Sequence, residues 1–422
     1  MSKSEKLTTQ KLPTESYKGV RDFYPPEQAQ LNYLFTTMRM VAERAGYVDY
    51  GASVLEPAEL YKSKNAENEE IIKEQTYTFV DRGGREVTLR PEMTPTVARM
   101  VAAKRREFGY PLRLYCIPNF FRYERPQRGR LREFWQLNVD LFGSRSPAAD
   151  AEVIGIAYGV MRALGGSEND FVIKVGSRPA MNQVAERAGL SPEATKKFFA
   201  LLDRRAKISA VEFEQGLREL GVPLSAVSAE EVPADVAQML ADFRTQGVGN
   251  IVYDPSIVRG FAYYTGIVFE VFDLHPANNR AVGGGGRYDN LTELFDDEPL
   301  PGVGFAMGDE PLRLFMEARG LIPPYAPPTQ AYVALAAPEV LPEATKLVQE
   351  LRQAGVCVAQ DFGERKLGDQ LKTASKHQIP YVIIVGQDEL MAGAFTVRNL
   401  ATGKEEHVGR EQLAPYFLTL KI

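Results

Sequence analysis

The stretch that decides the fold is FFRYERPQRGRLREFWQLNVDLFG, at residues 120–143. Its first half, from Arg122 to Arg132, holds five arginines and one glutamate. Arginine suits phosphate groups because its planar guanidinium donates two parallel hydrogen bonds. The chain as a whole has a formal net charge of −5, so this local excess of positive charge predicts a polyanionic partner.

The second half of this stretch predicts a β-strand with two unlike faces, since successive side chains of a strand point to opposite sides. One face is apolar and is expected to be core: Trp135, Leu137, Val139 and Leu141. The other face is mostly polar and is expected to floor a site: Phe134, Gln136, Asn138 and Asp140. An exposed antiparallel sheet beside a solvated loop explains the pattern about equally well, so the pattern alone leaves both interpretations open.

The flanking segments predict an α+β domain. A helix is indicated from about Glu27 to Ala45, ended by Gly46, and a second over residues 95–104. Strands are expected over residues 47–55, 77–80, 86–90, 112–117 and 134–142. Few crossover helices separate these strands, so we expect an antiparallel sheet flanked by helices.

Two changes of pattern mark the domain organisation. Residues 181–246 are rich in Ala, Glu, Leu and Arg at helical spacing, which predicts a helical insertion. The strand pattern then resumes at Ile251 and runs through Phe272. Four prolines between Ile322 and Pro328 indicate a linker. We therefore expect one domain over residues 1–325 and a compact α/β domain over residues 329–422. In the second domain, strands are expected over residues 331–336, 356–360 and 381–385, with helices near residues 342–354 and 366–377.

Composition limits the classes of function. Hydrophobic residues make up 44% of the chain and charged residues 25%, which is ordinary for a globular protein. Two distant cysteines, Cys116 and Cys357, argue against a disulfide framework or a zinc site and fit a reducing cytosol. With three histidines in the chain, no protein-bound metal is expected. We also expect no signal peptide and no membrane-spanning segment.

Three further stretches carry candidate site residues. Arg259 opens an expected strand that reads IVRGFAYYTGIVFEVF and includes the pair Tyr263 and Tyr264. Residues 90–94 read RPEMT, residues 283–289 read GGGGRYD, and residues 302–313 read GVGFAMGDEPLR. Each has a structural explanation by itself, because paired tyrosines usually pack, Thr94 can cap a helix and glycine runs usually form turns. Their combination is more specific than any one of them.

Together these stretches resemble the class II histidyl-tRNA synthetases, and the resemblance extends over nearly the whole chain. It implies the class II antiparallel sheet with flanking helices and a C-terminal α/β anticodon-binding domain. Arg259 and Arg122 would be catalytic. The implied histidine-binding residues are Glu92, Met93, Thr94, Gln136, Asp140, Arg259, Tyr263 and Tyr264. The implied ATP-binding residues are Arg122, Glu124, Arg130 and Phe134. Contacts with tRNA are implied for Gln127, Arg128 and Arg365.

The resemblance also implies a reaction, in which ATP and histidine form histidyl-adenylate and the histidyl group then passes to tRNA(His). ATP would enter with Mg²⁺, and the enzyme would be a cytoplasmic homodimer with Glu56 and Pro57 at its interface. In this family, the equivalent of Arg259 bridges the substrate carboxylate and the α-phosphate, where other class II enzymes place a metal. A preorganised guanidinium lowers the cost of bringing two anions together.

The chain departs from the family pattern at three places. Pro311 stands where an arginine usually holds the ATP γ-phosphate. Arg313 is a poor replacement because two residues along a helix turn about 200° away, which leaves Arg287 or an arginine of the 122–132 loop as candidates. Asp140 stands where a glutamate usually reaches the imidazole, and Phe261-Ala262 where Leu-Asp is usual.

Two other functions fit the resemblance. One is a non-catalytic, histidine-sensing regulatory subunit of ATP phosphoribosyltransferase, and the other is a paralogue that binds histidine without charging tRNA. The ligase is favoured because Arg122 and Arg259 are both present. The C-terminal domain favours it too, since the regulatory subunits typically lack that domain.

Overall fold

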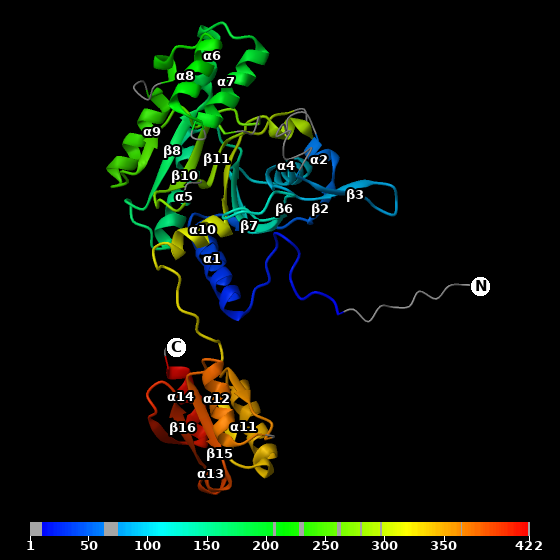
Figure 1. The fold of residues 1–422 in the computed structure, drawn as a ribbon, viewed down its shortest axis with the longest axis vertical. Helices are drawn as coiled ribbons and strands as arrows, with labels where there is room; N and C mark the ends of the chain where they lie inside the picture. Colours follow the sequence, from blue (N-terminus) through cyan, green and yellow to red (C-terminus); the bar gives the residue numbers. More distant parts are fainter. Residues whose placement is uncertain are drawn as a thin grey trace, which may run out of the picture. The chain divides into compact units, whose positions relative to one another are not determined.

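The computed structural model describes residues 11–62, 75–205, 208–227, 232–259, 263–278, 281–295, 298–363 and 365–420. The chain divides into two compact units (Figure 1). The first comprises Met1–Phe23 with Gln30–Ile322, and the second Tyr24–Ala29 with Pro323–Ile422.

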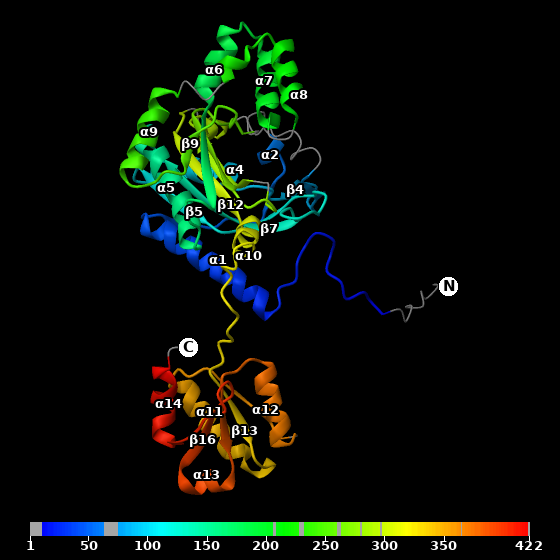
Figure 2. The same cartoon turned by 60° about the vertical axis from the view of Figure 1, so that its left-hand side comes forward.

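The first unit is built on a large, mostly antiparallel sheet, with β7 and β12 near its middle (Figure 2). Its strands, in spatial order, are β1 (Val48–Asp49), β5 (Leu112–Cys116), β7 (Glu133–Phe142), β12 (Gly302–Gly308), β11 (Ala281–Arg287), β10 (Ile267–Asp273), β8 (Phe171–Ser177) and β9 (Ile251–Tyr253). The short strand β6 (Asn119–Phe121) pairs with the start of β7. A separate small sheet holds β2 (Leu55–Pro57), β4 (Glu86–Leu89) and β3 (Tyr77–Val80).

Helices cover both faces of the large sheet. On one face a single core joins the sheet to α1 (Pro25–Arg44), α5 (Pro147–Ala163), α9 (Ala234–Thr245) and α10 (Asp309–Glu317). On the other face α4 (Thr94–Ala103) packs near Tyr263, Tyr264 and Tyr288. The short helix α2 (Glu59–Lys62) lies beside α4, and the 3-10 turn η3 (Leu291–Leu294) also contacts α4.

The alternation read from the sequence of β7 is present in the structure. Leu137, Val139 and Leu141 belong to the main core. Gln136 and Asn138, on the opposite face, line a pocket. The predicted fold class, a class II antiparallel sheet flanked by helices with a C-terminal α/β domain, is therefore confirmed.

The strand expected to open at Arg259 and run to Phe272 is wrong in its first part. The structure has two strands, β9 and β10, which both pair with β8, and no described residue between them belongs to a strand. Arg259 has a φ of +51°, in the left-handed region that no β-strand residue occupies. Arg259, Tyr263 and Tyr264 therefore belong to the loop before β10. The strand expected over residues 47–55 is likewise two short strands, β1 and β2.

Residues 178–245 are mainly helical. The helices are α6 (Arg178–Arg187), α7 (Pro192–Arg204), α8 (Ala210–Glu219) and α9, with a 3-10 turn η2 (Leu224–Val227). The side-chain oxygens of Ser177, Ser191 and Ser209 each accept a hydrogen bond from a backbone N–H of the first turn, which caps α6, α7 and α8. Helices α6 to α8 have a core of their own, with Phe198 and Phe213 at its centre.

The second unit is an α/β sandwich. Its sheet has the order β14 (Val358–Gln360), β13 (Ala331–Leu335), β15 (Tyr381–Val385), β16 (Ala394–Asn399) and β17 (Glu405–Gly409). The first three strands are parallel, and β16 and β17 extend the sheet in antiparallel fashion. The helices are α11 (Leu341–Gln353), α12 (Leu367–Lys376), α13 (Gln387–Ala392) and α14 (Arg410–Thr419), with the 3-10 turn η4 (Pro338–Val340). The sequence predicted the strands β13, β14 and β15, and it missed β16 and β17.

Across the described parts of both units, no helix combines the length and the apolar character needed to cross a membrane.

Breaking the buried ion pair between β11 and α5 should destabilise the first unit. The guanidinium of Arg287 donates from Nε and Nη2 to Asp150, and the side chains are 9% and 4% exposed. We expect Asp150→Ala to lower the free energy of unfolding by about 3–5 kcal/mol, because the buried cation loses its two-bond partner and keeps only Asp289, at 3.2 Å, as a counter-charge. Urea unfolding followed by circular dichroism measures this. Lys104→Ala, which breaks an exposed pair with Glu107, is the control and should change the free energy by about 0.5 kcal/mol or less. Equal losses for both variants would contradict the prediction.

Candidate active site

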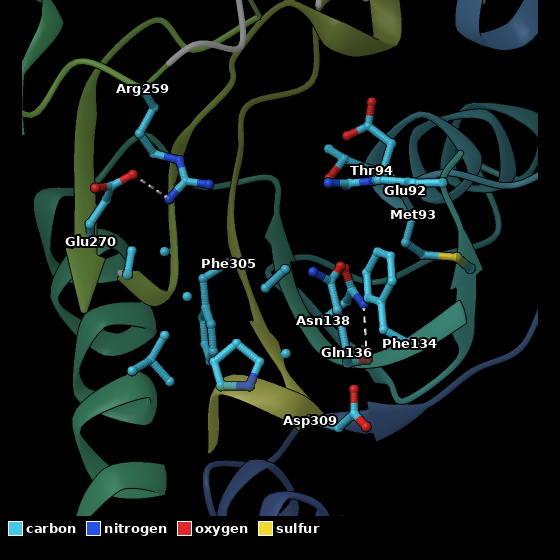
Figure 3. A pocket seen from close by; sticks show the side chains of 18 of the residues that line it. Glu92, Met93, Thr94, Phe134, Gln136, Asn138, Arg259, Glu270, Phe305 and Asp309 are labelled. Carbon is cyan, nitrogen blue, oxygen red and sulfur yellow. Dashed lines mark hydrogen bonds and ion pairs between the residues drawn. The ribbon is translucent and has the colours of Figure 1, made fainter. Parts of the chain in front are cut away.

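A single pocket in the first unit collects most of the site residues expected from the sequence. It lies on the face of the sheet that carries Gln136 and Asn138, with a cavity volume of about 300 Å³. Figure 3 shows Arg259 and Glu270 on one side of the pocket and Glu92, Met93 and Thr94 on the other. Its walls come from the turn before α4, the loop after β6, and strands β7, β10, β11 and β12.

Arg122 is fixed at the start of the basic loop. Its Nε donates to the carbonyl oxygen of Pro91 at 2.9 Å, and its guanidinium carbon lies 5.3 Å from the ring centre of Phe134. Burial lowers the pKa of the Arg122 guanidinium, and the carboxylates of Glu92 and Glu124 raise it. The cation is thus held rigidly with its Nη atoms free of any protein hydrogen bond in the parts of the chain that the structure describes.

Arg259 faces the same pocket from the other side. Its Nη1 lies 3.4 Å from Oε1 of Glu270 and 3.5 Å from the carbonyl oxygen of Phe269. Its Nε is buried and has no hydrogen-bond partner within the described residues. A left-handed φ in a non-glycine residue costs about 1–3 kcal/mol and is typical of functional sites. Gly284 on β11 makes room for this side chain, because a Cβ there would lie 2.1 Å from Arg259 Nη1.

Glu92 supplies a carboxylate to the pocket that Arg122 and Arg259 line. Its Oε2 accepts a hydrogen bond from the hydroxyl of Tyr263 at 3.4 Å. Burial raises the pKa of Glu92 to about 7, and Arg122, Tyr263 and Arg259 act in the opposite direction. A carboxyl group with this pKa gains strongly from a bound cation, so an ammonium group is the ligand that this position suits.

Asp140 lies behind the pocket rather than in its wall. It is 3% exposed, and its Oδ1 accepts a hydrogen bond from the hydroxyl of Tyr288. Tyr288 is the member of this pair that lines the pocket. Burial raises the pKa of Asp140 to about 7, and the bond from Tyr288 lowers it. Gly304 on β12 leaves space for the pair, because a Cβ would lie 2.4 Å from Asp140 Oδ1 and 3.0 Å from the Tyr288 hydroxyl.

The end of the pocket nearest the basic loop combines an aromatic ring with charges. Phe134 packs between Arg122 and Phe120, with ring centres 5.9 Å apart for the two phenylalanines. The exposed side chain of Arg130 lies 3.3 Å from Glu124. All except Phe120 line the pocket. A flat ring beside two guanidinium groups is an arrangement that fits a nucleotide.

The two arginines considered as replacements at position 311 are engaged elsewhere. Arg313 is held by Glu310 and by Glu317 on α10. Arg287 is held by Asp150 and Asp289 and lies outside the pocket wall. Among the candidates named from the sequence, only the 122–132 loop supplies arginines to the pocket that Pro311 lines, and these are Arg122 and Arg130.

The residues expected to contact tRNA lie apart from the pocket. Gln127 and Arg128 are exposed in the loop between β6 and β7. Arg365, in the second unit, donates from Nη2 to Asp361 at 2.5 Å and from Nη1 to Thr373 at 2.6 Å. Its side chain is 45% exposed, so it remains accessible at the start of α12.

The sequence also contained pocket residues to which no role was assigned. Asn138 stood in the polar row of β7, Glu270 in the stretch at 257–272, and Tyr288 in the glycine-rich stretch. Their spacing was visible, but their neighbours depend on sheet register. Glu270 lies opposite Gly284, which brings its carboxylate to Arg259.

Known protein families match both units of the chain. Residues 19–312 match the family described as Histidyl-tRNA synthetase, and residues 330–420 match the family described as Anticodon binding domain. The histidine–tRNA ligase of Leptospira biflexa serovar Patoc is 38% identical over 418 residues, which are 94% of this chain and 95% of that protein. The histidine–tRNA ligase of Thermoplasma volcanium is 36% identical over 428 residues, which are 96% of this chain and 98% of that protein.

A solved structure shares the fold. The crystal structure of histidyl-tRNA synthetase from Nostoc sp. PCC 7120 superimposes with a TM-score of 0.80 at 24% identity, covering 97% of this chain and 99% of that one. At this identity the likeness shows a shared fold. Membership of a family is shown by the two matched families and by the relatives above 30% identity. The chain belongs to the histidyl-tRNA synthetase family.

Proposed function

We propose that this protein is a histidine–tRNA ligase, which activates histidine with ATP and transfers the histidyl group to tRNA(His). The observation that carries the proposal is one pocket lined by Arg122, Arg259 and Glu92, in which Glu92 accepts a hydrogen bond from Tyr263. Two fixed cations beside one carboxylate suit a substrate that brings a carboxylate, an ammonium group and a phosphate together.

In the first step, a carboxylate oxygen of histidine forms a bond to the α-phosphorus of ATP. The bond from that phosphorus to the oxygen of pyrophosphate breaks, and pyrophosphate leaves. Two anions approach and charge builds on the phosphoryl oxygens, so Arg122 and Arg259 would stabilise the transition state. ATP enters with Mg²⁺ as part of the substrate, and Phe134, Glu124 and Arg130 would hold its adenine and phosphate ends.

Histidine recognition would combine the two ends of the amino acid. Glu92, Thr94 and Gln136 would bind the α-ammonium group, beside the backbone at Met93. Tyr263, Tyr264 and Asp140 would select the imidazole, and the position of Tyr288 suggests that Asp140 acts through its hydroxyl. A buried polar pocket rejects other side chains strongly, because its hydrogen-bonding groups would be left unpaired.

In the second step, a terminal ribose hydroxyl of the tRNA attacks the carbonyl carbon of histidyl-adenylate, and AMP leaves. Gln127 and Arg128 would contact the acceptor end, and Arg365 the anticodon region. The exposure of all three supports this part of the proposal. The regulatory-subunit and non-charging alternatives are less favoured, because the relatives at 34–38% identity are histidine–tRNA ligases over almost their whole length.

A homodimer and a cytoplasmic location complete the proposal. Two apolar side chains at strands of the first unit support an interface near Glu56 and Pro57. Val48 on β1 is 64% exposed and Leu55 on β2 is 45% exposed. The domain limits 1–325 and 329–422 are also retained, and the division of the chain near Ile322 supports them.

Histidine-dependent exchange of pyrophosphate into ATP tests the function directly. We expect exchange with histidine and none with other amino acids, followed by charging of tRNA(His). Absence of exchange in the purified protein would favour the histidine-sensing alternative.

Removing the Arg259 guanidinium should abolish activation while the fold survives. We expect Arg259→Gln to lower the rate of exchange by about 100-fold or more, because one preorganised charge contributes that much to a phosphoryl or acyl transition state. The circular dichroism spectrum should not change. Arg85→Gln, at an arginine whose side chain is 80% exposed, should exchange at the wild-type rate. Normal exchange by Arg259→Gln would remove Arg259 from the mechanism.

Neutralising Glu92 should stabilise the fold and destroy function. The pKa of Glu92 is raised from 4.5 to about 7, so the folded state disfavours its charge. Above pH 7 the carboxylate is ionised in both states and the whole penalty applies, whereas below pH 4.5 it is protonated in both and the penalty vanishes. We expect Glu92→Gln to raise the free energy of unfolding at pH 8 by up to about 3 kcal/mol. The gain should disappear near pH 4, and the KM for histidine should rise sharply. A gain at pH 4 equal to that at pH 8 would contradict this assignment.

Removing the hydroxyl of Tyr288 should weaken the binding of histidine more than the binding of ATP. We expect Tyr288→Phe to raise the KM for histidine by about tenfold, since it leaves the Asp140 carboxyl group without its donor. The KM for ATP should stay at the wild-type value. Tyr47→Phe is the matched control, because Tyr47 is a buried tyrosine that donates to Glu152, outside the pocket. Equal histidine KM values in Tyr288→Phe and wild type would contradict the role of the pair.

A further inference from the structure

The first turn of α10 presents an electrostatic problem to the proposed ATP site. Asp309, Glu310 and Pro311 all line the pocket, beside Arg130 and Glu124. Two consecutive acidic residues therefore belong to the wall of the proposed ATP pocket, and Pro311 adds no cation. Unbalanced, they would repel the phosphates, since like charges in a partly desolvated site repel strongly.

Arg21, in the segment before α1, forms ion pairs with both carboxylates. Its Nη2 lies 2.5 Å from Oδ2 of Asp309 and its Nη1 2.8 Å from Oε2 of Glu310. The guanidinium also packs against aromatic rings, with its central carbon 4.9 Å from the ring centre of Phe23 and 6.0 Å from that of Trp135. Its side chain is 21% exposed, so the guanidinium is partly shielded from water.

Asp309 connects Arg21 to the floor of the pocket. Its side chain is 1% exposed, and its Oδ1 accepts a hydrogen bond from the backbone N–H of Trp135 at 2.9 Å. Trp135 sits on β7 between Phe134 and Gln136, which both line the pocket. One buried carboxylate thus links the N-terminal segment, α10 and the strand that floors the site.

Glu310 already has a second cation, because Arg313 donates to it from Nε and Nη2 at 2.9 Å each. Asp309 has no cation other than Arg21 within the described residues. Arg21 is therefore the group that decides whether this turn carries an uncompensated negative charge.

We propose that Arg21 is a positioning residue for ATP, which holds and neutralises Asp309 so that the triphosphate can lie against the first turn of α10. This inference rests on the proposed function for the identity of the nucleotide. Arg21 acts through Asp309 and Glu310 and does not itself line the pocket. It compensates in part for the cation that is missing at position 311.

The test compares a ligand that has a phosphate tail with one that lacks it. Dissociation constants for ATP and for adenosine are measured by isothermal titration calorimetry on the full chain. We expect Arg21→Gln to raise the dissociation constant for ATP by about tenfold, the size of one unfavourable charge contact. The dissociation constant for adenosine should stay unchanged. In exchange assays the same variant should raise the KM for ATP without raising the KM for histidine. A structural disturbance of β7 would weaken the binding of adenosine and of ATP equally, and that result would overturn the proposal.

Two further variants separate charge from folding. Arg21→Lys keeps the charge and should bind ATP more tightly than Arg21→Gln. The double variant Arg21→Gln with Asp309→Asn removes both charges, keeps an acceptor for the Trp135 N–H and should recover most of the ATP affinity. Failure of the double variant to recover ATP binding, while it unfolds at the wild-type temperature, would overturn the proposal.

Arg113→Gln is the matched control. Arg113 forms a two-bond ion pair with Glu152 at 2.7 and 2.9 Å, and neither residue lines the pocket. This variant should bind ATP and adenosine as the wild type does. If the wild-type protein binds ATP but shows no exchange, the ligase proposal fails, while the binding comparison still decides the role of Arg21.

Discussion

The antiparallel pairing of β7 with β12 is the constraint on which the rest of the structure depends. The register places Asp140 opposite Gly304 and Gln136 opposite Gly308. With this register, Leu137, Val139 and Leu141 enter the core while Gln136 and Asn138 face the pocket. A slip of one residue would exchange the two faces and destroy core and site together. The glycines of β11 and β12 then leave the space above the sheet that Arg259 and the Tyr288–Asp140 pair fill.

The pocket concentrates charge in a setting that penalises charge. Glu92 and Asp140 both have a pKa raised to about 7 by burial, and Arg259 adopts a left-handed backbone conformation. These features cost stability, and the large core that joins the sheet to α1, α5 and α10 offsets the cost. A substrate that brings its own ammonium and phosphate charges would relieve part of this penalty on binding. The same logic extends to Asp309, which is buried only because Arg21 and the Trp135 N–H meet its two oxygens.

In the C-terminal unit, local sequence patterns predict some strands and miss others. Its three parallel strands follow from apolar runs that alternate with amphipathic helices, and β15 begins and ends at the expected residues. Strand β16 lies between β15 and β17 and was missed because polar residues interrupt its apolar ones, and β17 was missed as the edge strand of the sheet. Edge strands carry a weaker pattern than buried ones, since only one neighbour and one face constrain their side chains.

The sequence by itself determined the two faces of β7, the helical character of residues 181–246, the α/β unit after the prolines and the family to which the chain belongs. These follow from periodicity and from motifs that are local in the chain. Only the tertiary structure decided that Arg259, Tyr263 and Tyr264 lie in a loop before β10, that Asp140 stands behind Tyr288, and that Arg21 pairs with Asp309. Arg21 and Asp309 are 288 residues apart in the chain. The physical reason is that a side chain's partners depend on strand register, on the sign of the backbone φ angle and on packing between distant segments. None of these leaves a periodic trace in the sequence.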